Sequence, residues 1–159
     1  MIIINTGGTF NKRYNPLNGE LFVPSDDLAV REIVKKLSFD IEIIGIIYKD
    51  SLEFDDSDRA LLLEAIKRCD DEIIIVVHGT DTMNLSAKVI ADAEIKKVVI
   101  FTGAMEPFAI DKIEPTINLS VAIGYAKNAK NGVYISMGGV VGEYDRVVKN
   151  RELGRFIYV

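Results

Sequence analysis

Short runs of β-branched residues, separated by stretches with helical spacing, limit this chain to a small set of folds. The runs are apolar at almost every position and do not alternate strictly between apolar and polar side chains. This pattern is typical of strands that are buried on both faces of a parallel sheet. The runs extend from Ile2 to Asn5, Ile41 to Ile47, Ile73 to His78, Val98 to Phe101 and Val133 to Ser136.

Four helices are predicted between these strands. Ser25 to Asp27 and Asp55 to Asp58 supply capping and first-turn acidic residues for the first two, and Pro115 favours the start of the fourth. The third extends from Met83 to Ala93. Strand and helix therefore alternate, which predicts right-handed crossovers and a Rossmann-like α/β/α sandwich with a doubly wound, mainly parallel sheet. Ligands of such sheets bind beyond the carboxyl ends of the strands.

Length and charge narrow the class of protein further. A chain of 159 residues predicts one domain with one sizeable core. The formal net charge is −5, and no basic run is longer than two residues, so neither nucleic acid nor a membrane surface is an expected partner. An apolar run follows Met1 with no basic segment before it, which does not fit a secretory signal, and the cytoplasm is the expected location.

The scarcity of histidine and cysteine limits the available chemistry. His78 and Cys69 are single residues of their types, so a metal site with several histidines and a Cys-x-x-Cys motif are both excluded. Neither a Walker-type phosphate loop nor a GxGxxG fingerprint is present. The chemistry must therefore rest on hydroxyls, carboxylates or lysines.

Three of the predicted strands end in loops rich in glycine and hydroxyl side chains. The loops are Asn5 to Thr9, His78 to Thr82, and Thr102 to Met105. Any one of them alone is better explained as a tight turn or a helix cap. Three at the same sheet edge favour a site for an oxyanion or a carboxylate, because none of them carries the lysine of a phosphate loop.

The motifs Thr6-Gly7-Gly8-Thr9, His78-Gly79-Thr80-Asp81-Thr82 and Thr102-Gly103-Ala104-Met105 resemble the signatures of the bacterial-type L-asparaginase family. That family also includes a subunit of an archaeal tRNA-dependent amidotransferase. The resemblance covers nearly the whole chain, residues 1 to 159, and corresponds to the family's amino-terminal domain. The family's smaller carboxyl-terminal domain has no counterpart in this sequence.

The resemblance implies a role for several residues. Thr6 matches the nucleophilic threonine, Thr80 and Asp81 match the second threonine with its carboxylate, and Lys149 lies at the distance expected for the catalytic lysine. Ser51 matches the serine that contacts the substrate's α-carboxylate, while Asp81 would pair with its α-ammonium. Without the resemblance, Lys149 would be interpreted as a solvated surface cation.

Two aromatic residues near these motifs receive different interpretations. Tyr14 lies in a glycine-containing stretch that resembles the family's mobile lid, which implies a catalytic role; the alternative is an exposed loop aromatic. His78 is interpreted as a hydrogen-bonded structural residue at a strand end.

The resemblance further implies that Asn118 has a structural role where the fourth helix opens. No cofactor or metal is expected.

Two functional hypotheses follow from the sequence. The first is an amidohydrolase that releases ammonia from L-asparagine or a related small amide through a threonine acyl-enzyme. The second is a non-catalytic module that binds a small amino acid, or a subunit that another chain completes. In both cases we expect a homodimer or a higher homo-oligomer, since apolar surface that a second domain covers in relatives would otherwise be exposed.

Overall fold

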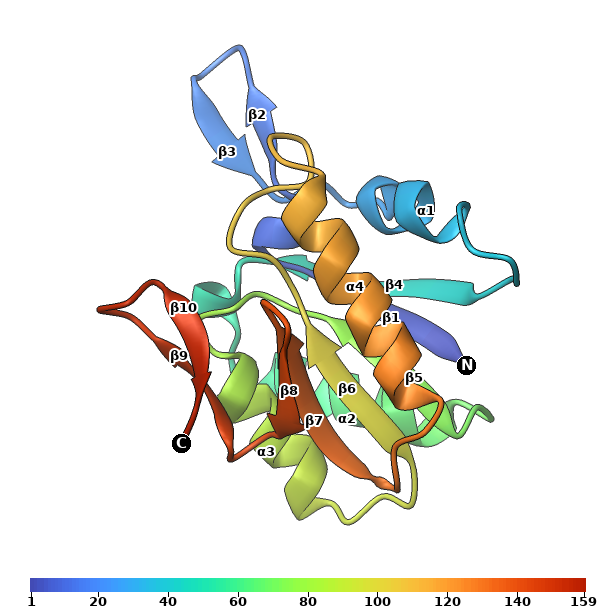
Figure 1. Ribbon diagram of the computed structural model, residues 1–159. Helices are drawn as coiled ribbons and strands as arrows, with labels where there is room; N and C mark the ends of the chain where they lie inside the picture. Colours follow the sequence, from blue (N-terminus) through green and yellow to red (C-terminus); the bar gives the residue numbers. More distant parts are fainter.

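The computed structural model describes all 159 residues and has a six-stranded central sheet in the order β4-β1-β5-β6-β7-β8 (Figure 1). Strands β4 to β7 are parallel to β1, and β8 pairs antiparallel with β7. The strands of this sheet are β1 (Ile2–Gly7), β4 (Glu42–Lys49), β5 (Ile73–Val77), β6 (Val98–Thr102), β7 (Gly132–Met137) and β8 (Val140–Glu143). The predicted mainly parallel α/β sandwich is confirmed.

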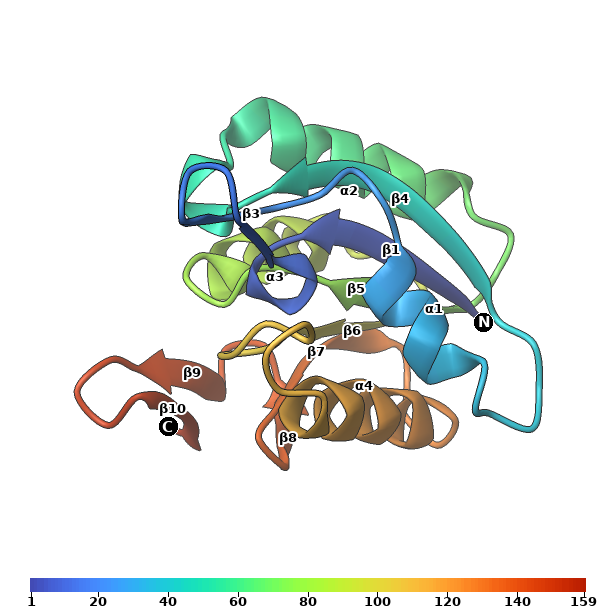
Figure 2. The same ribbon diagram turned by 90° about the horizontal axis from the view of Figure 1, so that it is seen from above.

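Helices cover both faces of this sheet, two on each face (Figure 2). Alternate residues of a strand point to opposite faces, so Ile2 and Ile4 pack towards α2 and α3, while Ile3 packs towards α1 and α4. Both faces are apolar, which explains the near-continuous runs in the sequence. The helices are α1 (Leu28–Val34), α2 (Asp56–Arg68), α3 (Met83–Asp92) and α4 (Ile113–Ala126).

The helix starts agree closely with the capping signals. Asp55 accepts a hydrogen bond from the Asp58 amide, and the Asp58 side chain accepts one from the Asp55 amide, so α2 opens with a capping box. At α1 the Asp26 side chain accepts a hydrogen bond from the Leu28 amide. Helix α4 begins at Ile113, two residues before the predicted Pro115.

One crossover has a different hand from the one predicted. The connections through α2 and α3 advance across the sheet on one face, and α1 connects in the reverse direction on the other face, so these three share one hand. Helix α4 advances from β6 to β7 on the face of α1, which is the opposite hand. About 98% of such crossovers are right-handed, so we assign the three connections that share one hand as right-handed. The α4 connection is then left-handed.

The position of α3 gives a physical reason for this exception. Helix α3 packs against β7, so the face that a right-handed crossover would use is already covered there. The opposite face carries Ile75, Ile100 and Tyr134, which α1 alone does not cover. Leu119, Ala122 and Ile123 of α4 bury this surface instead.

Two hairpins and two 3-10 turns complete the fold. The hairpins are β2 (Arg13–Asn15) with β3 (Glu20–Phe22), and β9 (Val147–Asn150) with β10 (Arg155–Tyr158); the turns are η1 (Thr9–Asn11) and η2 (Ser51–Glu53). The β2-β3 hairpin projects from the body of the molecule, and β9-β10 lies beside β8 (Figure 1). Sequence patterning predicted neither hairpin, because each strand has only three or four residues.

Winding of the sheet reverses between β1 and β5. The chain passes from β1 to β4 on one side, and then returns to place β5 on the other side of β1. The loops that follow these two neighbouring strands contain Thr9 and Thr80, and Thr6 is the penultimate residue of β1. They therefore open at the topological switch point, where ligands bind in doubly wound sheets.

No helix in the structure has the length and apolar character needed to cross a membrane.

Candidate active site

Three loops touch at the carboxyl edge of the sheet because glycine stands at two contact points. A Cβ atom on Gly8 would lie 2.5 Å from the Cα and amide nitrogen of Gly79, and one on Gly79 would lie 2.6 Å from the Cβ and Oγ of Ser51. Gly8 also has a φ of 72°, a conformation that glycine adopts without strain. Any larger side chain at Gly8 or Gly79 would separate the loops.

Side-chain amides hold the loop after β1 in its shape. Asn5 accepts hydrogen bonds from the Gly7 amide at 3.1 Å and from Asn11 Nδ2 at 2.8 Å, and Asn11 also donates to the Gly7 carbonyl at 2.9 Å. Both asparagines are buried. The Gly8 amide donates to the Lys49 carbonyl, which joins this loop to the end of β4.

A second set of contacts fixes Ser51. Lys12, which follows η1, forms an ion pair with Asp50, and Thr82 Oγ1 donates to the Ser51 carbonyl at 2.7 Å. Burial favours a higher pKa for the Asp50 carboxyl, but hydrogen bonds from Lys12 and the Leu52 amide, with the charges of Lys12 and Lys149, hold this pKa below its usual range. Ser51 is buried, and its Oγ atom has no hydrogen-bond partner. The Ser51 hydroxyl is therefore an unsatisfied polar group at the point where the three loops meet, and its contact with a substrate stays a prediction.

The polar cluster at the centre of the site consists of Thr80, Asp81 and Lys149. Lys149 Nζ donates a hydrogen bond to Thr80 Oγ1 at 2.8 Å and to Asp81 Oδ1 at 3.0 Å. The Lys149 side chain is only 17% exposed, so most of its aliphatic stem is shielded from solvent. The structure thus brings together three residues that lie up to 69 positions apart in the sequence.

Lys149 reaches this cluster from the β9-β10 hairpin. It pairs with Phe156 in the antiparallel ladder, and Phe156 and Val147 are buried in the same core cluster as α3. This packing anchors the hairpin beside the loop after β5. A solvated surface position for Lys149 is therefore inconsistent with the structure.

Thr6 does not present its hydroxyl to this cluster. It is the penultimate residue of β1, it is completely buried, and its Oγ1 donates to the Val77 carbonyl of the neighbouring strand at 2.9 Å. Thr9, by contrast, stands at the start of η1, directly after Gly8, and is only half-buried. Thr9 was not among the predicted site residues, although Gly7 and Gly8 indicate that the chain leaves the buried strand before Thr9.

Tyr14 also lies apart from the cluster. It belongs to the short strand β2, its side chain is 61% exposed, and its hydroxyl lies over Gly19 of the same hairpin. The structure therefore supports the exposed-aromatic interpretation of Tyr14. The projecting hairpin thus leaves this side chain facing solvent.

Asn118 has the structural role that the sequence implied. Its Nδ2 donates to the Gly103 carbonyl at 3.0 Å, and its Oδ1 accepts a hydrogen bond from the Gly138 amide at 2.8 Å. Glu114, one turn earlier in α4, accepts hydrogen bonds from the amides of Met105 and Glu106. Helix α4 thereby fixes the loops that follow β6 and β7.

His78 is a structural residue, as predicted. Its ring lies 4.5 Å from that of Phe54, it is completely buried, and Nδ1 hydrogen-bonds to the Gly79 carbonyl at 2.8 Å. Burial lowers the pKa of His78 to about 4, the charge of Arg59 adds to this effect, and the hydrogen bond to Gly79 opposes it. The imidazole is therefore neutral at pH 7.

The lowered pKa of His78 predicts that the folded protein loses stability in mild acid. The unfolded chain takes up this proton near the ordinary pKa of 6.5, whereas the folded chain does so only near 4. The free energy of unfolding should therefore fall as the pH drops from 6.5 towards 4, by about 3 kcal/mol in total. Urea unfolding at pH 7 and pH 5 measures this fall. Because His78 is the single histidine, a ring NMR signal that titrates near pH 6.5 in the folded protein would contradict the prediction.

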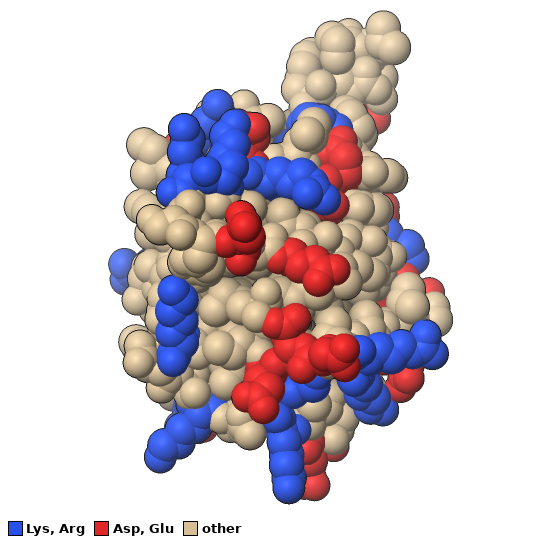
Figure 3. All heavy atoms as spheres, turned by 90° about the vertical axis from the view of Figure 1, so that its right-hand side faces the viewer, with Lys and Arg blue, Asp and Glu red and all other residues tan.

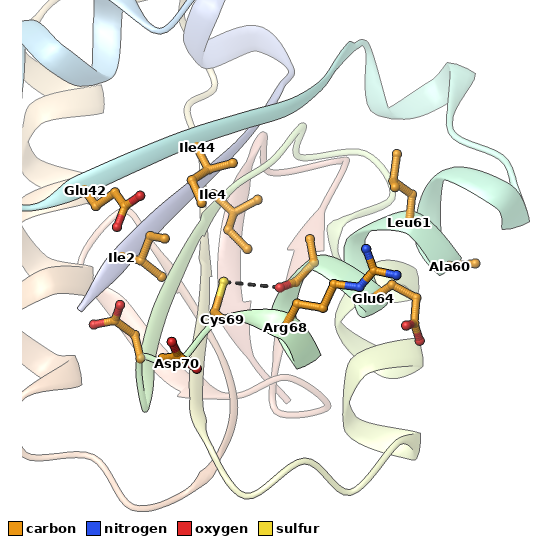
Figure 4. Close-up of a pocket in the computed structure, with 12 residues that line it drawn as sticks. Ile2, Ile4, Glu42, Ile44, Ala60, Leu61, Glu64, Arg68, Cys69 and Asp70 are labelled. Carbon is orange, nitrogen blue, oxygen red and sulfur yellow. Dashed lines mark hydrogen bonds between the residues drawn. The ribbon is translucent and has the colours of Figure 1, made fainter.

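A cavity lined mainly by apolar residues lies away from the hydroxyl-rich loops. It is an open groove of about 690 Å³ between α2 and the amino-terminal parts of β1 and β4, and Figure 4 shows Ile2, Ile44, Leu61 and Cys69 among its lining residues. Burial raises the pKa of the Cys69 thiol, which donates a hydrogen bond to the Ala65 carbonyl. None of the predicted site residues lines this cavity. The candidate site is therefore the polar cluster and not this cavity.

Charged residues of both signs lie on the side of the molecule that is at the right in Figure 1. Figure 3 shows acidic side chains across the middle of this face, with basic side chains above and below them.

No group of three or more His, Cys, Asp or Glu side chains is arranged to hold a metal ion.

The fold and the polar cluster define a class of protein: a doubly wound α/β domain with a threonine, an aspartate and a lysine joined at its switch point. The family model described as "Asparaginase, N-terminal" matches residues 1–155. The chain belongs to this family.

Two curated proteins resemble the sequence. The L-asparaginase of Thermococcus kodakarensis is 26% identical over 161 residues, covering 97% of this chain and 48% of that protein. A glutamyl-tRNA(Gln) amidotransferase subunit of Methanococcus maripaludis is 28% identical over 149 residues, covering 89% of this chain and 35% of that protein. The chain therefore spans half or less of the length of these relatives.

Solved structures show the same fold. The thermostable L-asparaginase of Thermococcus kodakarensis superposes with a TM-score of 0.86 at 23% identity, and a probable cytoplasmic L-asparaginase of Campylobacter jejuni superposes with a TM-score of 0.78 at 23% identity. Each comparison covers 99% of this chain and 50% of the other. The fold thus matches one half of each of these chains.

Proposed function

We propose that this chain forms the active-site half of an amidohydrolase that hydrolyses the side-chain amide of L-asparagine or a related small amide. The observation that carries this proposal is the 2.8 Å hydrogen bond from Lys149 Nζ to Thr80 Oγ1, made while Lys149 is also paired with Asp81. An amine, a hydroxyl and a carboxylate in one shielded cluster can position and transfer protons in acyl transfer.

We place the nucleophile of this reaction at Thr9. Its oxygen would attack the amide carbonyl carbon, ammonia would leave with the proton taken from the hydroxyl, and water would then hydrolyse the acyl ester. Thr9 follows Gly8, whose backbone touches Gly79, the residue before Thr80. Thr6 fits this role less well, because its hydroxyl is buried and already donates to the Val77 carbonyl.

Ser51 and the glycine loops would hold the substrate's carboxylate. Ser51 Oγ is unpartnered, and it lies beside Gly79 at the point where the three loops meet. We propose that no cofactor takes part, since hydroxyl, amine and carboxylate groups supply each step of this scheme.

Ammonia release from a panel of small amides tests the proposed function. The purified chain should release ammonia from at least one of L-asparagine, L-glutamine and their analogues without a free α-ammonium. Measurable binding of these ligands without any ammonia release would instead favour the second hypothesis, a binding module or a subunit that needs another chain. The amidotransferase component among the relatives is compatible with that alternative.

We also propose that the chain self-associates, as a homodimer or a larger homo-oligomer. Large apolar side chains are exposed on both hairpins, including Leu17 at 94%, Leu153 at 57% and Tyr158 at 61%. Burying such groups between two copies would remove them from water. Sedimentation equilibrium at micromolar concentration should show a dimer or larger species. A strict monomer across this range would contradict self-association.

A further inference from the structure

Arg151 contributes a second cation to the carboxylate of Asp81. Its Nη1 donates to Asp81 Oδ1 at 2.8 Å, the same oxygen that accepts the hydrogen bond from Lys149 Nζ at 3.0 Å. Nη2 of Arg151 also approaches the Asp81 carbonyl at 3.4 Å. The guanidinium thus contacts both the side chain and the backbone of Asp81.

The hairpin places both cations on the same loop. Lys149 belongs to β9, Arg151 begins the turn two residues later, and both side chains contact Asp81. Asn150 Oδ1 accepts a hydrogen bond from the Leu153 amide at 2.8 Å, and this bond fixes the shape of the turn. The Arg151 side chain remains 65% exposed, so a ligand can reach its free N–H groups.

These contacts change the charge that a substrate meets. Asp81 carries one negative charge, and Lys149 and Arg151 together carry two positive charges, so the group is positive by one unit. The nearby carboxylate of Asp50 has its own partner in Lys12 and does not reverse this balance. An α-ammonium approaching Asp81 would therefore be opposed by two cations within a few ångströms. A carboxylate would be attracted, and a guanidinium can bind it with two hydrogen bonds.

Resting on the amidohydrolase function proposed above, we propose that Arg151 makes the site select monoamides of dicarboxylic acids that carry no free α-ammonium. Arg151 neutralises Asp81 and offers its remaining donors to the substrate's carboxylate. The reaction converts the monoamide and water into the dicarboxylate and ammonium, with no further reactant. Succinamate represents this substrate class, and L-asparagine differs from it by the α-ammonium.

Binding of the two reaction products tests this selectivity without requiring turnover. Isothermal titration should show that the wild-type protein binds succinate at least about tenfold more tightly than L-aspartate. In Arg151→Gln the ratio of succinate affinity to L-aspartate affinity should fall by about tenfold, because one of the two cations that oppose the ammonium is removed. Arg151→Lys keeps a positive charge and should keep most of the preference. Tighter binding of L-aspartate by the wild-type protein, or an unchanged ratio in Arg151→Gln, would overturn the proposal.

A matched control separates the local charge from the overall charge of the protein. Arg155 lies on β10 of the same hairpin, is exposed and forms no ion pair, so Arg155→Gln removes one positive charge without touching Asp81. It should leave the succinate-to-aspartate ratio unchanged, and an equal fall in both variants would contradict a specific role for Arg151. Ammonia release from succinamate and L-asparagine distinguishes the two proposals. If Arg151→Gln changed the ratio of succinate to L-aspartate affinity but the wild-type protein released ammonia from neither amide, the amidohydrolase function would be disproved. The proposed selectivity of binding would still be supported.

Discussion

Replacing Lys149 with methionine is expected to lower amide hydrolysis by roughly 10³-fold or more. The ammonium of Lys149 is the group that joins Thr80 to Asp81, with hydrogen bonds of 2.8 and 3.0 Å. Methionine keeps much of the aliphatic stem, which is shielded from solvent, but removes every donor from the cluster. Ammonia release under saturating amide measures the effect, and circular dichroism checks that the fold is retained.

A second lysine provides the control for this variant. Lys130 lies between α4 and the start of β7, at the amino-terminal edge of the sheet, is exposed and forms no ion pair, so Lys130→Met removes the same charge at the edge opposite the cluster. It should retain near-wild-type turnover. If Lys149→Met kept more than about a tenth of the wild-type rate, Lys149 would be a structural ion-pair partner of Asp81 and not part of the catalytic machinery.

The two threonines of the first motif are expected to respond in opposite ways to replacement by valine. Thr9→Val should lower turnover by roughly 10³-fold or more while leaving stability nearly unchanged, because it removes the proposed nucleophile from a half-buried turn. Thr6→Val should instead keep most of the activity and lower the free energy of unfolding by about 1 kcal/mol, since the Val77 carbonyl loses its hydroxyl donor.

Two measurements on each variant distinguish these outcomes: ammonia release, and the urea midpoint of unfolding. Valine is close to threonine in shape, so each variant serves as the control for the other. Loss of turnover in Thr6→Val with full activity in Thr9→Val would return the nucleophile to Thr6. It would also require Thr6 to leave its hydrogen bond with Val77 during the reaction.

Local sequence patterns predicted the central part of the fold. The apolar runs correspond to β1, β4, β5, β6 and β7, because strands buried on both faces need apolar side chains at nearly every position. Capping residues marked the start of α2 through a box formed by Asp55 and Asp58. These signals depend on residues close together in the chain, so they can be read without knowing the tertiary structure.

The short hairpins and the hand of the α4 crossover could not be predicted in this way. Strands of three or four residues carry too few positions for a pattern, and they are stabilised by pairing with each other and by packing on the body of the protein. The hand of the α4 crossover depends on which face of the sheet α3 has already covered, and this is a property of the assembled sheet.

Sequence patterns were sufficient to predict the doubly wound sheet and the edge that carries the hydroxyl-rich loops. The family resemblance pointed to Thr80, Asp81 and Lys149 as candidate site residues. The folded structure was needed to show that Thr6 is completely buried while Thr9 is only half-buried. It was also needed to show that Tyr14 is exposed and that Arg151 shares Asp81 with Lys149. The difference lies in how far apart in the sequence the interacting residues are. Strand burial and helix capping act between neighbours in the chain, whereas the exposure of a hydroxyl and the pairing of charges 70 residues apart depend on how distant loops pack together.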